Sequence, residues 1–105
     1  MAADDFTTEL SEAWGYHRAG RNDEAHKTFD RILSRQPDQV DALFGIGLVQ
    51  RVLGMKDKSI ESFDRCRKVA QKELDADPGA DRYLMLLKMI QQRIHEVETD
   101  SLISS

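Results

Sequence analysis

The side chains best suited to chemistry are three histidines and one cysteine, and their spacing forms no recognisable site. His17, His26 and His95 contain no pair at i, i+4, and Cys66 has no second cysteine with which to complete a zinc-binding spacing. A single cysteine at an inward-facing helical position is better explained as a small packed hydrophobe than as a nucleophile. We therefore expect no catalytic residue, no metal and no cofactor.

The stretch Gly45-Ile46-Gly47 has the glycine content of a phosphate-binding loop but not its context. Such loops follow a strand, whereas this stretch lies within a run of helical hydrophobic spacing. No serine lies in a nucleophile-elbow context either. Close packing between helices is the favoured explanation of the glycines, so an enzyme is not expected. A small enzyme or ligand-binding domain is the least favoured alternative.

The chain is organised by a period of 34 residues, and the elements that repeat with this period would have to position any functional site. Several residues recur with that spacing, among them Phe29-Asp30-Arg31 as Phe63-Asp64-Arg65, Gly20 as Gly54 and Asp23 as Asp57. A fixed period of this size is the signature of stacked supersecondary units. Within each unit, hydrophobic residues follow helical spacing along two segments, and no segment alternates long enough to predict a strand.

Glycine and proline mark the ends of the predicted helices. Gly20 and Gly54 are placed to end the first helix of each unit, and Pro37 and Pro78 follow the second. Pro78 comes seven residues later than the repeat predicts, and seven residues are about two helical turns. We therefore predict one uninterrupted long helix over about 57–74.

These features resemble the tetratricopeptide repeat, a family of stacked helix pairs with a period of 34 residues. The matching positions are Ala13-x2-Tyr16, Ala25-x3-Phe29 and Pro37 in the first unit, and Leu43-x2-Ile46-Gly47 and Ser59-x3-Phe63 in the second. Glu9, Glu12 and Gln50 depart from the family's pattern, which suggests a less buried first helix. The alternative is an ordinary helical bundle in which the 34-residue recurrence arose by chance.

The resemblance implies an all-α fold, a short right-handed α-solenoid of about five helices in antiparallel pairs. We predict a helical domain over residues 1–98, with repeat 1 at about 6–39, an extended repeat 2 at about 40–79 and a capping helix at about 80–97. A flexible tail is expected at 99–105.

In this family the first helix of each unit lines a concave groove. Carried onto this sequence, the resemblance implies the following partner-binding residues: Leu10, Trp14, His17, Arg18, Phe44, Leu48, Arg51, Met85, Met89 and Arg93. The apolar members would form a strip suited to an amphipathic helix or hydrophobic peptide, and the cationic members a rim suited to an acidic group. Alternatively, Trp14 and Phe44 belong to the core.

The predicted function is that of an adaptor or scaffold that binds another protein or peptide, with a homodimer through the same surface as the alternative. The net charge of −4 argues against binding to nucleic acid. No apolar stretch approaches the roughly 20 residues of a membrane span, so no membrane insertion is expected. The single cysteine and the lack of a signal-peptide pattern favour a cytoplasmic protein.

Overall fold

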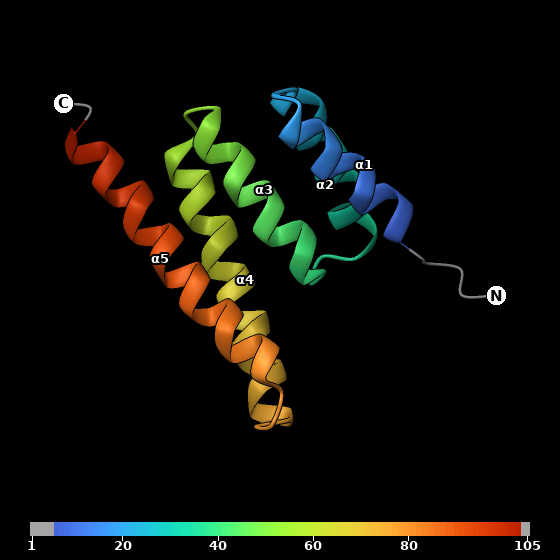
Figure 1. The fold of residues 1–105 in the computed structure, drawn as a ribbon, viewed down its shortest axis with the longest axis vertical. Coiled ribbons are helices and arrows are strands. Elements are labelled where there is room, and N and C mark those ends of the chain that lie inside the picture. The colour runs from blue at the N-terminus through green and yellow to red at the C-terminus, as the bar shows by residue number, and fades with distance from the viewer. Residues whose placement is uncertain (1–5, 104–105) are drawn as a thin grey trace.

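The computed structural model describes residues 6–103, which fold into five α-helices with no strand (Figure 1). The helices are α1 (Thr7–Arg18), α2 (Asn22–Arg35), α3 (Val40–Val52), α4 (Lys56–Ala76) and α5 (Asp81–Ile103). Each helix packs against the next, and α3 also contacts both α1 and α5. The predicted all-α architecture is confirmed, and α3 lies between α1 and α5 (Figure 1).

The same turn ends α1 and α3, at positions separated by the 34-residue period. Gly20 and Gly54 both have φ of 79°, a left-handed conformation that is strained for a residue with a Cβ. Each time, the residue after the glycine donates its backbone N–H to the carbonyl five residues earlier, at 2.8 Å. This is the Schellman arrangement, which satisfies carbonyls at a helix end. The repeat in the sequence is therefore also a repeat of backbone geometry.

Helix α4 is longer than its counterpart α2 by about two turns. It has 21 residues and α2 has 14, a difference of seven. Seven added residues rotate the apolar face by only about 20°, so the face stays directed at the core and Ala70 remains fully buried. The prediction of an uninterrupted long helix over 57–74 is confirmed. With α5, the added turns form a hairpin that projects beyond the start of α3 (Figure 1).

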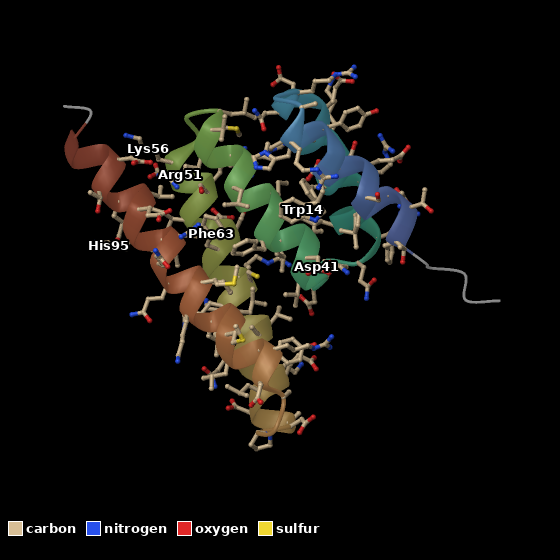
Figure 2. All side chains as sticks on the ribbon, in the orientation of Figure 1. Trp14, Asp41, Arg51, Lys56, Phe63 and His95 are labelled. Carbon is tan, nitrogen blue, oxygen red and sulfur yellow. The ribbon has the colours of Figure 1, made fainter. Side chains whose placement is uncertain are left out.

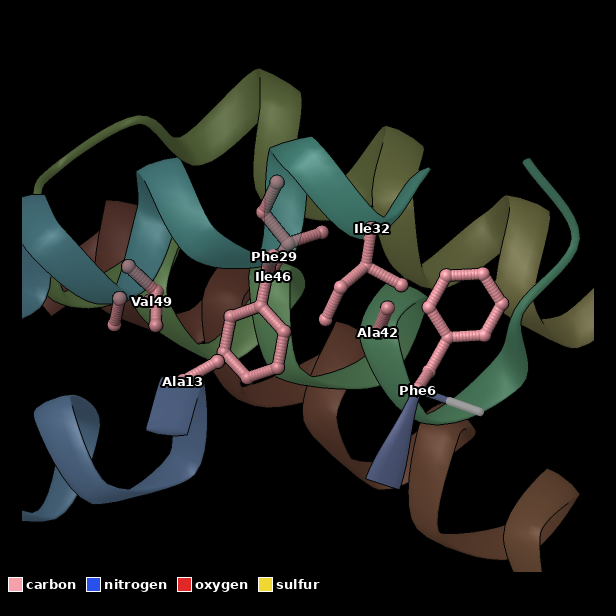
Figure 3. Packing of buried hydrophobic residues seen from close by; sticks show 8 residues of the cluster. Phe6, Ala13, Phe29, Ile32, Ala42, Ile46 and Val49 are labelled. Carbon is pink, nitrogen blue, oxygen red and sulfur yellow. The ribbon is translucent and has the colours of Figure 1, made fainter. Parts of the chain in front are cut away.

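Two phenylalanines form the centres of two hydrophobic clusters. Phe29 of α2 lies among side chains of α1, α2 and α3 (Figure 3), and Phe63 of α4 lies among side chains of α3, α4 and α5. Both are fully buried. Helix α3 serves both clusters because Gly45 faces Phe29 and Gly47 faces Phe63. A Cβ on either glycine would overlap the facing ring, so both glycines allow the close helix packing that the sequence predicted.

Gln50, one of the departures from the repeat pattern, is buried in a polar bridge between three helices. Its side-chain oxygen accepts a hydrogen bond from the Ser62 hydroxyl of α4 at 2.6 Å. Its side-chain nitrogen lies 3.3 Å from Nε2 of His26 on α2. Because a buried amide is costly unless it is hydrogen-bonded, these partners explain how α3 accommodates a polar residue here.

The C-terminal region differs from the prediction of a capping helix at 80–97 followed by a flexible tail at 99–105. Helix α5 continues to Ile103. Val97 is fully buried, and one turn later Asp100 pairs with Arg51 of α3, so tertiary contacts hold the last turns in the helix. The part of the predicted tail at 104–105 lies outside the described residues.

Candidate functional site

Arg51, in the last turn of α3, holds α3 and α5 together through two carboxylates. It donates from Nη1 to Glu96 Oε1 at 2.8 Å and from Nε to Asp100 Oδ2 at 2.7 Å. Glu96 also accepts a hydrogen bond from Arg93 Nη2 at 3.1 Å. We call these four residues the Arg51 clamp; Figure 2 shows Arg51 near the end of α3, beside α5.

The clamp determines the electrostatics at this end of the two helices. The hydrogen bond from Arg51 lowers the pKa of Asp100, and the same bond raises the pKa of Arg51. The side chains are about one-third exposed, so each pair alone stabilises little, but two carboxylates on one guanidinium define its position. Arg51 and Arg93 are therefore engaged by carboxylates of their own chain.

On α3, the predicted site residues Phe44 and Leu48 lie on the same helical face as Arg51. They precede it by seven and three residues, which are the spacings of neighbouring side chains on a helix. Both are half-buried against the second cluster. The Phe44 ring meets the Phe63 ring edge to face, with 5.6 Å between centroids. These side chains therefore contribute to the core and also border the surface.

On α5, Met85 and Met89 precede Arg93 on the face directed at α3. Their exposed fractions are 65% and 47%. Arg93 belongs to the Arg51 clamp, and residues four and eight positions earlier lie on the same side of the helix. The structure thus brings together six of the predicted residues. We call Phe44, Leu48, Met85 and Met89 the α3–α5 face, with the clamp at one end.

The predicted residues of α1 lie on the other side of α3. Leu10 and Trp14 are half-buried against the first cluster, and Trp14 meets Phe29 edge to face at 5.3 Å between centroids. Figure 2 shows Trp14 between α1 and α3. His17 Nδ1 lies 2.8 Å from Asn22 Oδ1. Arg18 is exposed, and its side chain forms no ion pair within residues 6–103.

A cleft of about 560 Å³ opens where the projecting α4–α5 hairpin passes the start of α3. Its apolar floor consists of four half-buried side chains: Val40, Val69, Tyr83 and Leu86. Charged side chains around it include Asp41, Lys72, Glu73 and Arg82. Asp41 lies one turn before Phe44, and Arg82 lies one turn before Met85. This hairpin cleft therefore continues the α3–α5 face at the end opposite to the clamp.

The thiol of Cys66 lies within the second hydrophobic cluster. Cys66 is fully buried and its Sγ donates to the Val40 carbonyl at 3.5 Å. Burial, with a smaller effect of the Asp41 charge, raises the pKa of this thiol to about 12, so it stays protonated near neutral pH. Across residues 6–103, no three His, Cys, Asp or Glu side chains are grouped to hold a metal ion. None of the helices in that range has the length and apolar character needed to cross a membrane.

Glu96 and Asp100 were not predicted as functional residues. Their spacing of four residues, continuing the face of Met89 and Arg93, was the signal that could have identified them. Because the helix was predicted to end at Val97, Asp100 was not placed on that face. The hairpin cleft was not predicted either, because it depends on how far two helices project beyond a third.

Comparisons with known proteins support the fold. A scan against protein-family models finds no match, and a search of curated proteins finds none either. Among solved structures, the chain is similar to a tetratricopeptide repeat domain protein from Salinibacter ruber, with a TM-score of 0.73 and 20% sequence identity. The similarity covers 90% of this chain and 97% of that one. The fold is therefore that of a tetratricopeptide repeat domain, as the 34-residue period predicted.

Proposed function

We propose that this chain is a protein–protein interaction module whose α3–α5 face binds an apolar peptide or amphipathic helix of a partner protein. The observation that carries the proposal is the exposure of Met85 and Met89, at 65% and 47%, on the side of α5 that faces α3. Neighbouring exposed apolar side chains are typical of interaction sites. Methionine suits such a site because its flexible thioether adapts to the shape of the bound side chains.

The surroundings of the two methionines favour an apolar segment over an acidic one. Phe44 and Leu48 extend the apolar surface across to α3, and both are anchored in the second cluster. A helix can bind such a surface with side chains at i, i+3, i+4 and i+7. The arginines of the clamp, Arg51 and Arg93, already contact Glu96, so an acidic group at that end of the face would have to displace that carboxylate.

Leu84 provides a matched control for the methionines. It lies on the same helix with an exposed fraction of 45%, close to the 47% of Met89. Five residues separate the two positions, which places them about 140° apart around the helix. Aspartate at either position therefore introduces the same charge on α5, but on different sides.

The test is capture of partners from an extract of the source cells by the wild-type chain, Met89→Asp and Leu84→Asp, with circular dichroism to confirm folding. If Met89 is a binding hot spot, its replacement should reduce capture of the main partner roughly 30-fold, and Leu84→Asp should change it less than about twofold. Equal capture by the two variants would refute the proposal.

A second copy of the chain is the alternative occupant of the α3–α5 face. Sedimentation velocity over a range of concentrations separates the two cases. A monomer at all concentrations is expected for a module that binds a different protein. A dimer that Met89→Asp dissociates and Leu84→Asp leaves intact would assign the face to self-association.

A further inference from the structure

The two ends of the α3–α5 face differ in charge. At the end where α3 stops, the Arg51 clamp combines two arginines with two carboxylates and carries no net charge. At the other end, in the hairpin cleft, the carboxylates of Asp41 and Glu73 form no ion pair or hydrogen bond within residues 6–103. A bound segment would therefore meet a neutral end and an end with unpaired negative charge.

The cations that line the hairpin cleft, Lys72 and Arg82, form no ion pair with Asp41 or Glu73 in the part of the chain that the structure describes. Arg82 lies over the Tyr83 ring, 4.6 Å from its centroid, and donates to the Tyr83 hydroxyl at 2.7 Å. Lys72 is exposed. A third carboxylate, that of Asp38, also lines the cleft, but it lies 3.8 Å from Nη2 of Arg65, so Asp41 and Glu73 are the cleft carboxylates left without an ion pair within residues 6–103. The whole chain has a net charge of −4, which favours the approach of a basic partner.

The floor and the mouth of the cleft together match a long basic side chain. Lysine and arginine bury an apolar stem and keep the charged end in water. The half-buried Val40, Val69 and Leu86 offer apolar contacts for the stem. Asp41 and Glu73 at the mouth offer charge-assisted hydrogen bonds for the cation.

Resting on the proposed function, we infer that the segment bound on the α3–α5 face inserts a lysine or arginine side chain into the hairpin cleft. Its stem lies on the apolar floor and its cation lies beside Asp41 and Glu73. The rest of the segment covers Met85 and Met89, which follow the cleft along α5. The cleft thus selects partners with a basic residue next to an apolar stretch, and it determines the direction in which the segment binds.

The direct test is a nuclear magnetic resonance titration of the full chain with three capped amino acids: N-acetyl-lysine methylamide, its norleucine analogue and its glutamate analogue. Norleucine keeps the aliphatic stem of lysine and lacks the amine. We expect the lysine probe to shift the backbone amide signals of Val40, Asp41 and Tyr83. It should bind about two- to fivefold more tightly than norleucine, the range for exposed ion pairs, and glutamate should bind most weakly.

Two substitutions at exposed positions, one that removes a carboxylate and one that removes a cation, should have opposite effects on binding of the lysine probe. Asp41→Asn should weaken the lysine probe about two- to fivefold, and Lys72→Met should strengthen it by a similar factor because it removes a competing cation. Equal binding of lysine and norleucine, a preference for glutamate, reversed effects of the variants, or no shifts in the cleft would each overturn the inference. The capture experiment with Met89→Asp tests the proposed function separately. If one of these results is found but Met89→Asp still reduces partner capture, the inference about the cleft fails and the proposed function stands. If the cleft prefers the lysine probe but Met89→Asp does not reduce partner capture, the proposed function fails.

Discussion

Replacing Gly47 with alanine tests the packing of α3 between the two phenylalanine clusters. A Cβ at this position would lie 2.7 Å from one carbon of the Phe63 ring and 2.9 Å from two others. Carbon atoms in contact prefer about 3.5–4.0 Å, so the ring would have to move by roughly 0.8 Å. Phe63 is fully buried among the side chains of the second cluster, so its movement would displace packed neighbours.

The expected loss follows from two opposing contributions. Overpacking a core costs about 1–3 kcal/mol, and three close ring atoms place this site near the upper value. Alanine in a helix gains about 1 kcal/mol over glycine. The net loss of unfolding free energy is therefore about 2 kcal/mol, which corresponds to a melting temperature lower by roughly 10 °C in a domain of this size.

Gly15, within α1, is the matched control. A Cβ there would have no atom within 4 Å, so Gly15→Ala should raise the free energy of unfolding by about 0.5–1 kcal/mol. Urea unfolding followed by circular dichroism measures both variants. Adding Phe63→Leu to Gly47→Ala should recover part of the loss, since the two sites share one contact. A Gly47→Ala chain as stable as Gly15→Ala would refute this account of the packing.

Three further predictions concern single side chains. Phe63→Ala should cost about 3–5 kcal/mol in urea unfolding and Phe44→Ala clearly less, because Phe44 is only half-buried; equal losses would place Phe44 fully in the core. Cys66, with its pKa raised to about 12, should react with a thiol reagent at pH 8 far more slowly in the folded chain than in urea, and equal rates would contradict its burial. Because Arg51 lowers the pKa of Asp100, the clamp stabilises the folded state above the ordinary aspartate pKa, and this contribution is lost as the pH falls through the lowered value. Chemical shifts of the last turn of α5 should therefore report loss of helix below about pH 4, and an identical acid response in Arg51→Gln would contradict the clamp.

Much of the fold could be predicted because its determinants are local and recur. Gly20 and Gly54 end their helices through a backbone conformation that glycine adopts most easily. Phe29 and Phe63 occupy equivalent positions in two copies of one unit, so each supports the interpretation of the other. The late Pro78 predicted the long α4 because seven residues nearly preserve the apolar face.

The candidate site was less predictable because it depends on contacts between distant residues. Arg51 was predicted to belong to a cationic rim that binds an acidic group of a partner, whereas it contacts Glu96 and Asp100 of its own chain, 45 and 49 residues away. The polar residues near the C-terminus have the composition of a frayed helix end, and only their contact with α3 shows that the helix continues. Periodicity also cannot separate a core residue from a surface residue at the border between them, which is where the structure places Trp14.

The central claim, that partners bind on the side of α5 facing α3, is tested most directly by crosslinking from neighbouring positions. Leu84 and Met85 are both exposed, at 45% and 65%, but point about 100° apart around the helix. A photoreactive benzoylphenylalanine at position 85 should crosslink to the captured partner, and the same residue at position 84 should not. Crosslinks from position 84 alone, or equally from both positions, would contradict the claim.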